Sequence, residues 1–125
     1  MTSGAKLGIL HGAAAYVCQN NEGQINDTAS ISAGLDYPGV SPIHCFLKDT
    51  KRARYTSATD EGALNAYKLV TKLEKINPSL EPSHAFAEAI KIAPKSGKNT
   101  IIIVNSCGDA KKDRDILKER LGKIN

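Results

Sequence analysis

The sequence has little with which to build a disulfide framework or a membrane span. Its three cysteines, Cys18, Cys45 and Cys107, are an odd number at wide spacing, and no CxxC motif occurs. This pattern argues against both a disulfide framework and a zinc site, and it favours a reducing compartment. No apolar run approaches the roughly 18 residues that cross a bilayer. We therefore expect a cytoplasmic protein with no membrane partner.

The common signatures of catalysis and nucleotide binding are missing too. The sequence contains no GxSxG, Walker A or GxGxxG motif, and its three histidines lack the HxxxH or HxH spacing typical of metal ligands. Two phenylalanines, four tyrosines and no tryptophan offer little stacking surface for bases. Seventeen basic against thirteen acidic residues leave a net charge of only +4. These numbers argue against a nucleic-acid partner, although they would suit a small anion.

What is present is an ordinary globular composition, with 41% hydrophobic and 24% charged residues in a chain of 125. This length predicts a single domain over residues 1–125. Residues 14–28 are predicted to form a hairpin that turns at residues 21–23. Ser41 and Pro42 favour the start of a short helix, and residues 53–59 alternate in the manner of a strand.

The second half of the sequence predicts helix, helix, strand and helix. Thr59 suits the N-cap of a helix over residues 59–74, and a second helix is expected over residues 83–93. The β-branched run "TIIIVN", residues 100–105, is typical of a parallel strand that is buried on both faces. An amphipathic helix follows it. The order of elements therefore predicts an α/β fold, with a hairpin followed by helices around a partial, mostly parallel sheet.

The three predicted helices each carry apolar residues at helical spacing, which we expect to face the core. These residues are Ala63, Leu64, Tyr67, Leu69, Val70, Leu73, Phe86, Ala89, Ile90, Ala93, Ile116, Leu117, Leu121 and Ile124.

Two stretches could hold a ligand. "SISAGLDYPGVSP", residues 30–42, is rich in small residues and turn formers and contains a single acid, Asp36. The turn after residues 100–105 lies where α/β proteins place ligands and anions. Cys107 in that turn could be a nucleophile, but a small buried cysteine is the commoner case. These residues by themselves specify no reaction.

Four long segments of the sequence carry a family resemblance. They are "HGAAAYVCQNNEGQINDTASISAGLDYPGV", "RARYTSATDEGALNAYKLVTKLE", "PSLEPSHAFAEAIKIAP" and "IIIVNSCG". In this order they resemble the C-terminal part of the tryptophan synthase beta chain, and "SISAGLDYPGV" is close to a signature of that family. The resemblance implies a fold-type II enzyme that depends on pyridoxal phosphate. The family condenses L-serine with indole, made by a partner alpha chain, to give tryptophan.

The resemblance also implies roles for particular residues. Asp36 matches an aspartate that contacts the serine-derived substrate and helps to close the site. The backbone carbonyls of Tyr37 and Gly39 match positions that hold a monovalent cation, sodium or potassium. Glu81 matches a glutamate close to the cofactor ring.

The turn at residues 106–108 matches the part of the family that binds the pyridine ring of the cofactor. Cys107 falls where the family has a serine that hydrogen-bonds the pyridine nitrogen, and Ser106 takes that place if the alignment shifts by one residue. Gly108 completes the implied cofactor-binding set. A neutral hydroxyl or thiol leaves that nitrogen unprotonated, which favours β-elimination and replacement. A thiol is the weaker hydrogen-bonding partner of the two.

Three short motifs depart from the family pattern. The family's "GVGPEH" is "GVSPIH" here, with Ser41 and Ile43, and its "EGIIPALE" is "EKINPSLE", with Lys75. Its "SGRGDKD" is "CGDAKKD", with Asp109. Each change removes a glycine or an acid near the implied site, so it bears on catalytic competence.

The resemblance places the Schiff-base lysine and the Gly-rich phosphate loop of the family upstream of Met1. We therefore expect this chain to be inactive alone and to form one wall of an active site, with the N-terminal part of the beta chain as its partner. The alternative is a divergent, non-catalytic α/β module that binds a small anion or a protein partner. In either case residues 99–108 should expose apolar surface and promote association.

Overall fold

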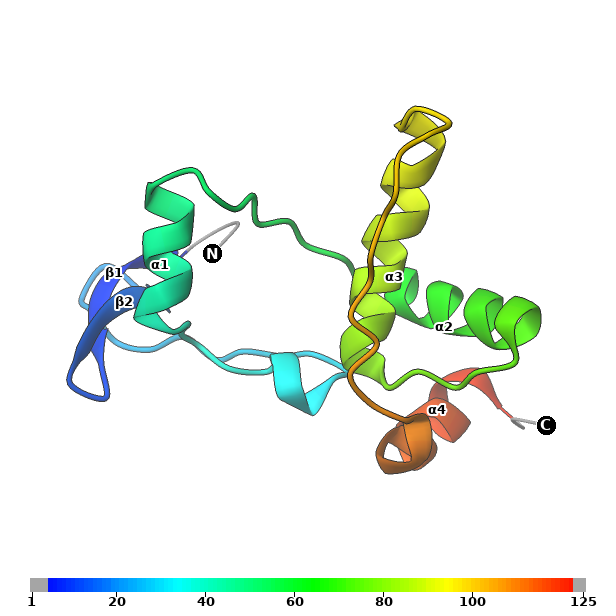
Figure 1. Cartoon of the computed structure of the whole chain (residues 1–125). Helices are drawn as coiled ribbons and strands as arrows, with labels where there is room; N and C mark the ends of the chain where they lie inside the picture. The colour runs from blue at the N-terminus through cyan, green and yellow to red at the C-terminus, as the bar shows by residue number, and fades with distance from the viewer. Residues whose placement is uncertain (1–4, 123–125) are drawn as a thin grey trace. The chain divides into compact units, whose positions relative to one another are not determined.

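The computed structural model describes residues 5–122 of the chain (Figure 1). The backbone forms two compact units. In the described part of the chain, unit one comprises residues 5–30 and 34–56, and unit two comprises residues 31–33 and 57–122. Among the described residues, no helix has the length and apolar character needed to cross a membrane.

An antiparallel hairpin is the centre of unit one. Strand β1, Ala5–Leu10, pairs with strand β2, Ala13–Cys18, along their whole length. The turn between them consists of His11 and Gly12, whose φ angles are +52° and +77°. Two positive φ angles in succession are typical of the tight turns that match the twist of a hairpin.

The predicted hairpin over residues 14–28 is therefore only partly correct. Its first arm lies in β2, and its turn contains the expected glycine in a left-handed conformation, since Gly23 has a φ of +82°. Its second arm is reduced to a single bridge between Gln19 and Ile25. The main partner of β2 is β1, because the two-residue turn allows six residue pairs to form in register.

Helix α1, Pro42–Asp49, confirms the short helix predicted from Ser41 and Pro42. Ser41 Oγ accepts a hydrogen bond from Ile43 N at 3.2 Å, so this side chain caps the first turn. The family pattern has a glycine at the position of Ser41, and a glycine could not make this bond.

Tyr16 connects β2 to α1. Its hydroxyl donates to Asp49 Oδ1 at 2.7 Å, and Lys48 Nζ lies 4.1 Å from the centroid of its ring. The hydrogen bond to Asp49 raises the pKa of Tyr16, an effect that Lys48 partly opposes. The backbone N–H of Tyr16 also donates to the sulfur of Cys45, which is buried between the two elements.

The predicted strand over residues 53–59 is wrong, since this stretch is irregular backbone. An alternating pattern produces a strand only where a neighbouring strand is available for pairing. The sheet in the described part of the chain consists of β1 and β2 alone.

Three α-helices and short 3-10 turns build unit two (Figure 1). The α-helices are α2, Asp60–Glu74, α3, Leu80–Ile92, and α4, Arg114–Leu121. The 3-10 turns of the chain are η1, Ala33–Leu35, which begins in unit two and ends in unit one, η2, Ala93–Lys95, and η3, Ala110–Asp113. The core of unit two contains Ile31, Ala63, Tyr67, Leu80, Ala110 and Leu117.

Helix α2 has the predicted limits. Thr59 Oγ1 accepts a hydrogen bond from Gly62 N at 3.1 Å and caps its start. At its other end Lys75 adopts the left-handed conformation, with a φ of +60°. The buried face carries Ala63, Ala66, Tyr67 and Val70, whereas Leu69 and Leu73 are exposed, so the prediction for these two leucines is wrong. They flank the buried face of the helix and are not covered by the core.

Helix α3 begins three residues earlier than predicted. Pro82 occupies its first turn, where a missing N–H costs no hydrogen bond. The buried residues are Leu80, Pro82 and Ser83 at the start of the helix. Ile90 and Ala93 are exposed and Phe86 and Ala89 are half-buried, which corrects the predicted inner side. The core lies against the first turn of α3 and does not extend along its length.

Helix α4 confirms the predicted amphipathic helix. Leu117 is buried, and Ile116 and Leu121 pack against the core. Ile124, the fourth residue of the predicted apolar side, lies outside the described residues.

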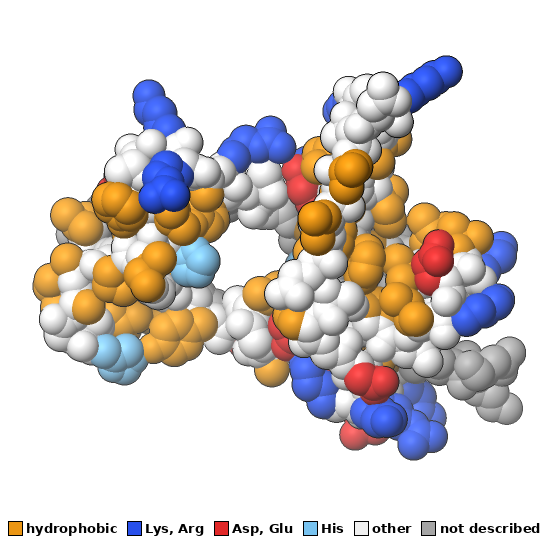
Figure 2. Space-filling view, in the orientation of Figure 1, with side chains coloured by type: hydrophobic (Ala, Val, Ile, Leu, Met, Phe, Trp, Pro, Cys, Tyr) orange, Lys and Arg blue, Asp and Glu red, His pale blue; other side chains and the backbone are white. Residues whose placement is uncertain are grey.

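The predicted buried strand at residues 100–105 is the largest correction. The segment has no strand assignment, and 86% of Ile101 and 90% of Ile103 is exposed to solvent. A parallel strand needs hydrogen-bonding neighbours on its edges, and no strand of the described unit two provides one. The expected exposure of apolar surface around residues 99–108 is confirmed, and Figure 2 shows hydrophobic side chains on the surface of this unit.

Candidate functional site

The residues implied as site residues fall into two groups. Asp36, Tyr37 and Gly39 belong to unit one, and the residues at positions 81 and 106–108 belong to unit two. The chain passes from one group to the other within "SISAGLDYPGV", residues 30–40, which we call the signature segment. Residues 31–33 are part of unit two, and residues 34–40 are part of unit one.

In unit one the backbone after Asp36 is attached to β2. Cys18 N donates to Pro38 O at 2.6 Å, and Val17 forms an antiparallel bridge with Gly39. A Cβ atom at Gly39 would lie 2.4 Å from Leu10 Cδ2, so a larger residue there would require the Leu10 side chain to move. Sequence reasoning expected this glycine to serve a turn, and the structure adds a close approach to β1.

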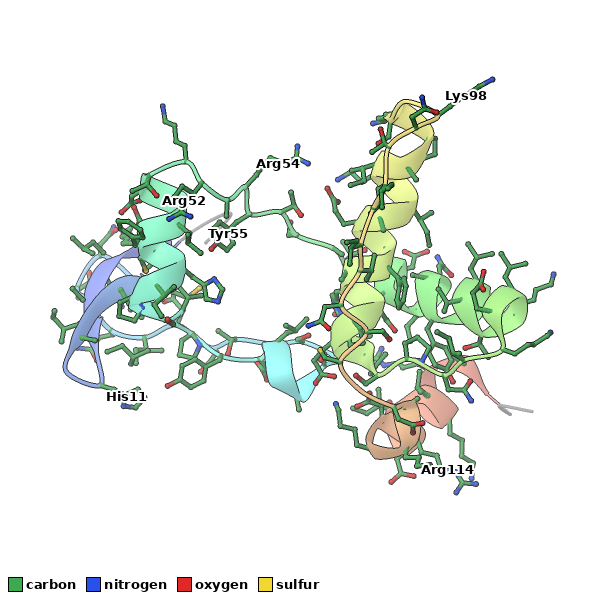
Figure 3. All side chains as sticks on the ribbon, viewed as in Figure 1. His11, Arg52, Arg54, Tyr55, Lys98 and Arg114 are labelled. Carbon is green, nitrogen blue, oxygen red and sulfur yellow. The ribbon has the colours of Figure 1, made fainter. Side chains whose placement is uncertain are left out.

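The side chain of Tyr37 contacts the turn of the hairpin. His11 Nε2 and the Tyr37 hydroxyl are 2.5 Å apart, and the two rings stack at an interplanar angle of 19°. Figure 3 shows His11 at the end of the hairpin. Both residues line a hollow that also includes Leu10 and Gly39. The sequence carries no signal for this contact, since the two residues are 26 positions apart.

Asp36 itself is exposed. Within residues 5–122 there is no group of three or more His, Cys, Asp or Glu side chains that could hold a metal ion. A monovalent cation held by the carbonyls of Tyr37 and Gly39 would use no such group, so that assignment stays a prediction.

In unit two the turn at residues 106–108 lies against the start of α3. Ser79 N donates to Gly108 O at 3.1 Å, and Ala110 N donates to Asn77 O at 3.0 Å. A Cβ atom at Gly108 would lie 2.7 Å from Ser79 Oγ, so the glycine permits this approach of the two backbones. Ser106 and Gly108 line a shallow hollow beside residues 75–78. Ser106 and Cys107 are both exposed, and the choice between them stays open.

Glu81 lies one residue into α3 with several polar neighbours. Its Oε1 accepts a hydrogen bond from Lys112 Nζ at 2.8 Å, and the same ammonium group lies 2.8 Å from Asp113 Oδ1. Burial raises the pKa of Glu81. The hydrogen bond from Lys112, the Glu81 backbone N–H and the neighbouring Ser32 and Ser79 outweigh burial and lower the pKa to about 2. Glu81 is therefore a carboxylate at any physiological pH.

The signature segment contributes directly to this cluster. Ser32 is fully buried in unit two and lies beside Glu81, where it helps to lower the pKa of that carboxyl group. The preceding backbone N–H, of Ile31, donates to Asp60 Oδ1 at 3.5 Å, and His84 Nε2 lies 3.8 Å from the same oxygen. Residues 31 and 32 thus lie beside two acidic residues, Asp60 in the first turn of α2 and Glu81 in the first turn of α3.

Four residues of this cluster were missed in the sequence: Ser32, Ser79, Lys112 and Asp113. Ser32 lies inside the signature that was singled out, so its position offered a signal. The ion pair between Lys112 and Glu81 spans 31 residues and could not be found from spacing.

Comparison with known proteins gives a consistent result. No family model matches the chain. Over 117 residues the chain is 50% identical to the tryptophan synthase beta chain of Bordetella petrii. These residues make up 94% of this chain and 29% of the relative. Over 113 residues it is 52% identical to the tryptophan synthase beta chains of Allorhizobium ampelinum and Chromobacterium violaceum. These residues make up 90% of this chain and 28% of each relative.

The fold and these relatives first define the class of protein to which the chain is related. The chain is an α/β protein, with a two-stranded hairpin and four α-helices in its described part, and its relatives are beta chains of a biosynthetic enzyme. More particularly, it is homologous to a part of the tryptophan synthase beta chain, as the resemblance in the sequence predicted. The chain spans less than a third of the length of these relatives.

Proposed function

We propose that this chain forms one wall of the active site of a tryptophan synthase beta chain. The intact enzyme would join L-serine and indole to L-tryptophan with pyridoxal phosphate, as a lyase of amino-acid biosynthesis in the cytoplasm. The observation that carries the proposal is the identity of about 50% over at least nine-tenths of this chain. The arrangement of Ser32 from the signature segment beside Glu81 supports it.

The residues of unit two suit one side of the cofactor. Pyridoxal phosphate would supply an electron sink for reactions at the substrate's α- and β-carbons. Ser106 or Cys107 would offer a neutral hydrogen-bonding group to the pyridine nitrogen, and Gly108 would allow a close approach of backbone. Glu81, held as a carboxylate by Lys112, would lie at the ring. The phosphate loop and the lysine that binds the cofactor would come from the remainder of the beta chain.

The residues of unit one would serve the substrate and a cation. Asp36 would contact the serine-derived substrate from an exposed loop. The carbonyls of Tyr37 and Gly39 would face sodium or potassium. The attachment of Pro38 and Gly39 to β2 supports this assignment, because it restrains the backbone that carries these carbonyls.

The partners proposed for the chain are the rest of the beta chain and the alpha chain that supplies indole. The exposed side chains of Ile101 and Ile103 support the rest of the beta chain as a partner. They lie in a segment that has no neighbouring strand in the described part of unit two. A strand from the rest of the beta chain would provide that neighbour.

A complementation experiment tests the proposal. The chain is incubated with pyridoxal phosphate, L-serine and indole, and we expect no tryptophan. Addition of the preceding segment of the Chromobacterium violaceum beta chain should restore tryptophan formation, and Asp36→Ala should then reduce the rate while Asp115→Ala, at an exposed position on α4, leaves it unchanged. Turnover by this chain alone would contradict the need for the rest of the enzyme. Failure of a folded, associated pair to form tryptophan would favour the non-catalytic module.

A further inference from the structure

Lys112 joins the two parts of unit two that carry the cofactor side of the proposed site. It lies in η3, a few residues after the turn at residues 106–108. Its ammonium group is 2.8 Å from Glu81 Oε1 in the first turn of α3 and 2.8 Å from Asp113 Oδ1. Both carboxylates are largely shielded from solvent, while about half of the lysine side chain is exposed.

Asp113 extends this connection to the backbone. Its Oδ2 accepts a hydrogen bond from Leu80 N at 2.8 Å, and Leu80 is the residue before Glu81. The segment around η3 is therefore attached to the first turn of α3 at two adjacent points. One point is the Leu80 N–H, and the other is the carboxylate of Glu81.

The charges around Glu81 show what Lys112 does. Asp113 is buried, so the carboxyl groups of Asp113 and Glu81 share this small region of unit two. Two carboxylates that contact one ammonium group would repel each other without it. The other groups beside Glu81 belong to Ser32 and Ser79, which are polar but bring no charge. Lys112 provides the cation: burial lowers its pKa, but the hydrogen bonds and the charges of Asp113 and Glu81 outweigh burial and raise the pKa overall.

We propose that Lys112 is a positioning residue that holds the Glu81 carboxylate in its place on the cofactor side of the site. The role of Glu81 at the cofactor rests on the proposed function. The control that Lys112 exerts over Glu81 does not, because every contact in the argument lies within unit two.

A carboxyl titration of the full chain tests this inference. The chain is labelled with ¹³C in its glutamate side chains, and the Glu81 signal is followed from pH 2 to pH 7 without cofactor. Lys112→Met should raise the pKa of Glu81 from about 2 towards its ordinary value near 4.5. Lys112→Arg should keep it low, because the charge is retained. Lys111→Met is the matched control, since Lys111 lines a different hollow with Arg114 and Lys118.

The possible results separate clearly. An unchanged Glu81 titration in a folded Lys112→Met variant would overturn the inference, as would an equal shift in Lys111→Met. If Lys112→Met does not fold, as judged by circular dichroism, the wild-type chain is used instead. Its Lys112 ammonium protons should then exchange with water more slowly than those of Lys111, and equal exchange would overturn the inference. If the Glu81 titration gives the expected shifts but complementation yields no tryptophan, the proposed function is refuted while the role of Lys112 stands.

Discussion

Glu81 owes its low pKa to neighbours from three separate segments of the chain. Ser32 comes from the signature segment, Ser79 precedes α3, and Lys112 lies in η3. A carboxyl group whose pKa is lower in the folded chain than in the unfolded chain stabilises the fold once it is ionised. The stabilisation is complete above the unfolded value near 4.5 and is lost as the pH falls towards about 2.

We therefore expect the chain to lose stability between pH 5 and pH 2 in a way that depends on Glu81. In urea unfolding, the Glu81 contribution should amount to on the order of 1 to 3 kcal/mol across this range. Glu81→Gln cannot titrate, so its free energy of unfolding should fall less steeply with acidification. Parallel curves for the two proteins would contradict the prediction.

The departures from the family pattern have local explanations at the same scale. Ser41 replaces a family glycine and caps α1. Asp109 accepts a hydrogen bond from Lys111 N at 2.8 Å and caps η3. Both side chains stabilise the element that follows them, so these two changes are compatible with the fold. Lys75 is different, because it occupies a conformation that suits the glycine it replaces.

At the scale of elements, the end of α2 carries a lysine in a backbone conformation that favours glycine. Lys75 has a φ of +60° and a ψ of +26°, which an L-residue adopts at a cost and glycine adopts freely. Its ammonium group donates to Lys72 O at 2.9 Å, which compensates part of that cost.

Lys75→Gly should accordingly be more stable than Lys75→Ala. Both variants lose the ammonium group, so the comparison isolates the backbone conformation. We expect a difference of roughly 1 kcal/mol in the free energy of unfolding, less the entropy that glycine adds to the unfolded chain. Urea unfolding with equal m-values measures it. An alanine variant as stable as the glycine variant would show that the left-handed turn is not retained.

The elements that could be predicted are those determined by neighbouring residues. Helix α2 was located from Thr59 and its apolar spacing, and α1 from Ser41 and Pro42, because caps and helical faces depend on residues within one or two turns. The pairing of β1 with β2 was missed, although the turn residues are adjacent in the sequence. Residues 53–59 and 100–105 have strand-like patterns, but a strand also requires a partner, and the pattern carries no information about one.

At the scale of the whole molecule, the exposed segment around Ile101 and Ile103 determines how the chain behaves in solution. The side chains of Ile101 and Ile103 are nearly fully exposed, and exposed apolar surface tends to associate. The same property would serve assembly with the rest of a beta chain.

We expect the isolated chain to self-associate in a concentration-dependent manner. The double change Ile101→Thr and Ile103→Thr should weaken association at least tenfold, since burying one such side chain contributes roughly 1.5 to 3 kcal/mol. Leu73→Thr is the matched control, because Leu73 is an exposed leucine on α2. Sedimentation equilibrium measures the constants. A wild-type chain that stays monomeric at all concentrations, or an equal effect of Leu73→Thr, would contradict the prediction.

The sequence by itself determined the kinship of this chain, the three main helices and the glycines at positions 39 and 108. These features depend on residue identity and on short-range geometry. The tertiary structure alone decided that Ser32 and Lys112 meet at Glu81, that His11 contacts Tyr37, and that Ile101 and Ile103 are exposed. Such contacts join residues far apart in the chain, and they form only when burial and charge pairing in the folded units offset the entropy of bringing those segments together.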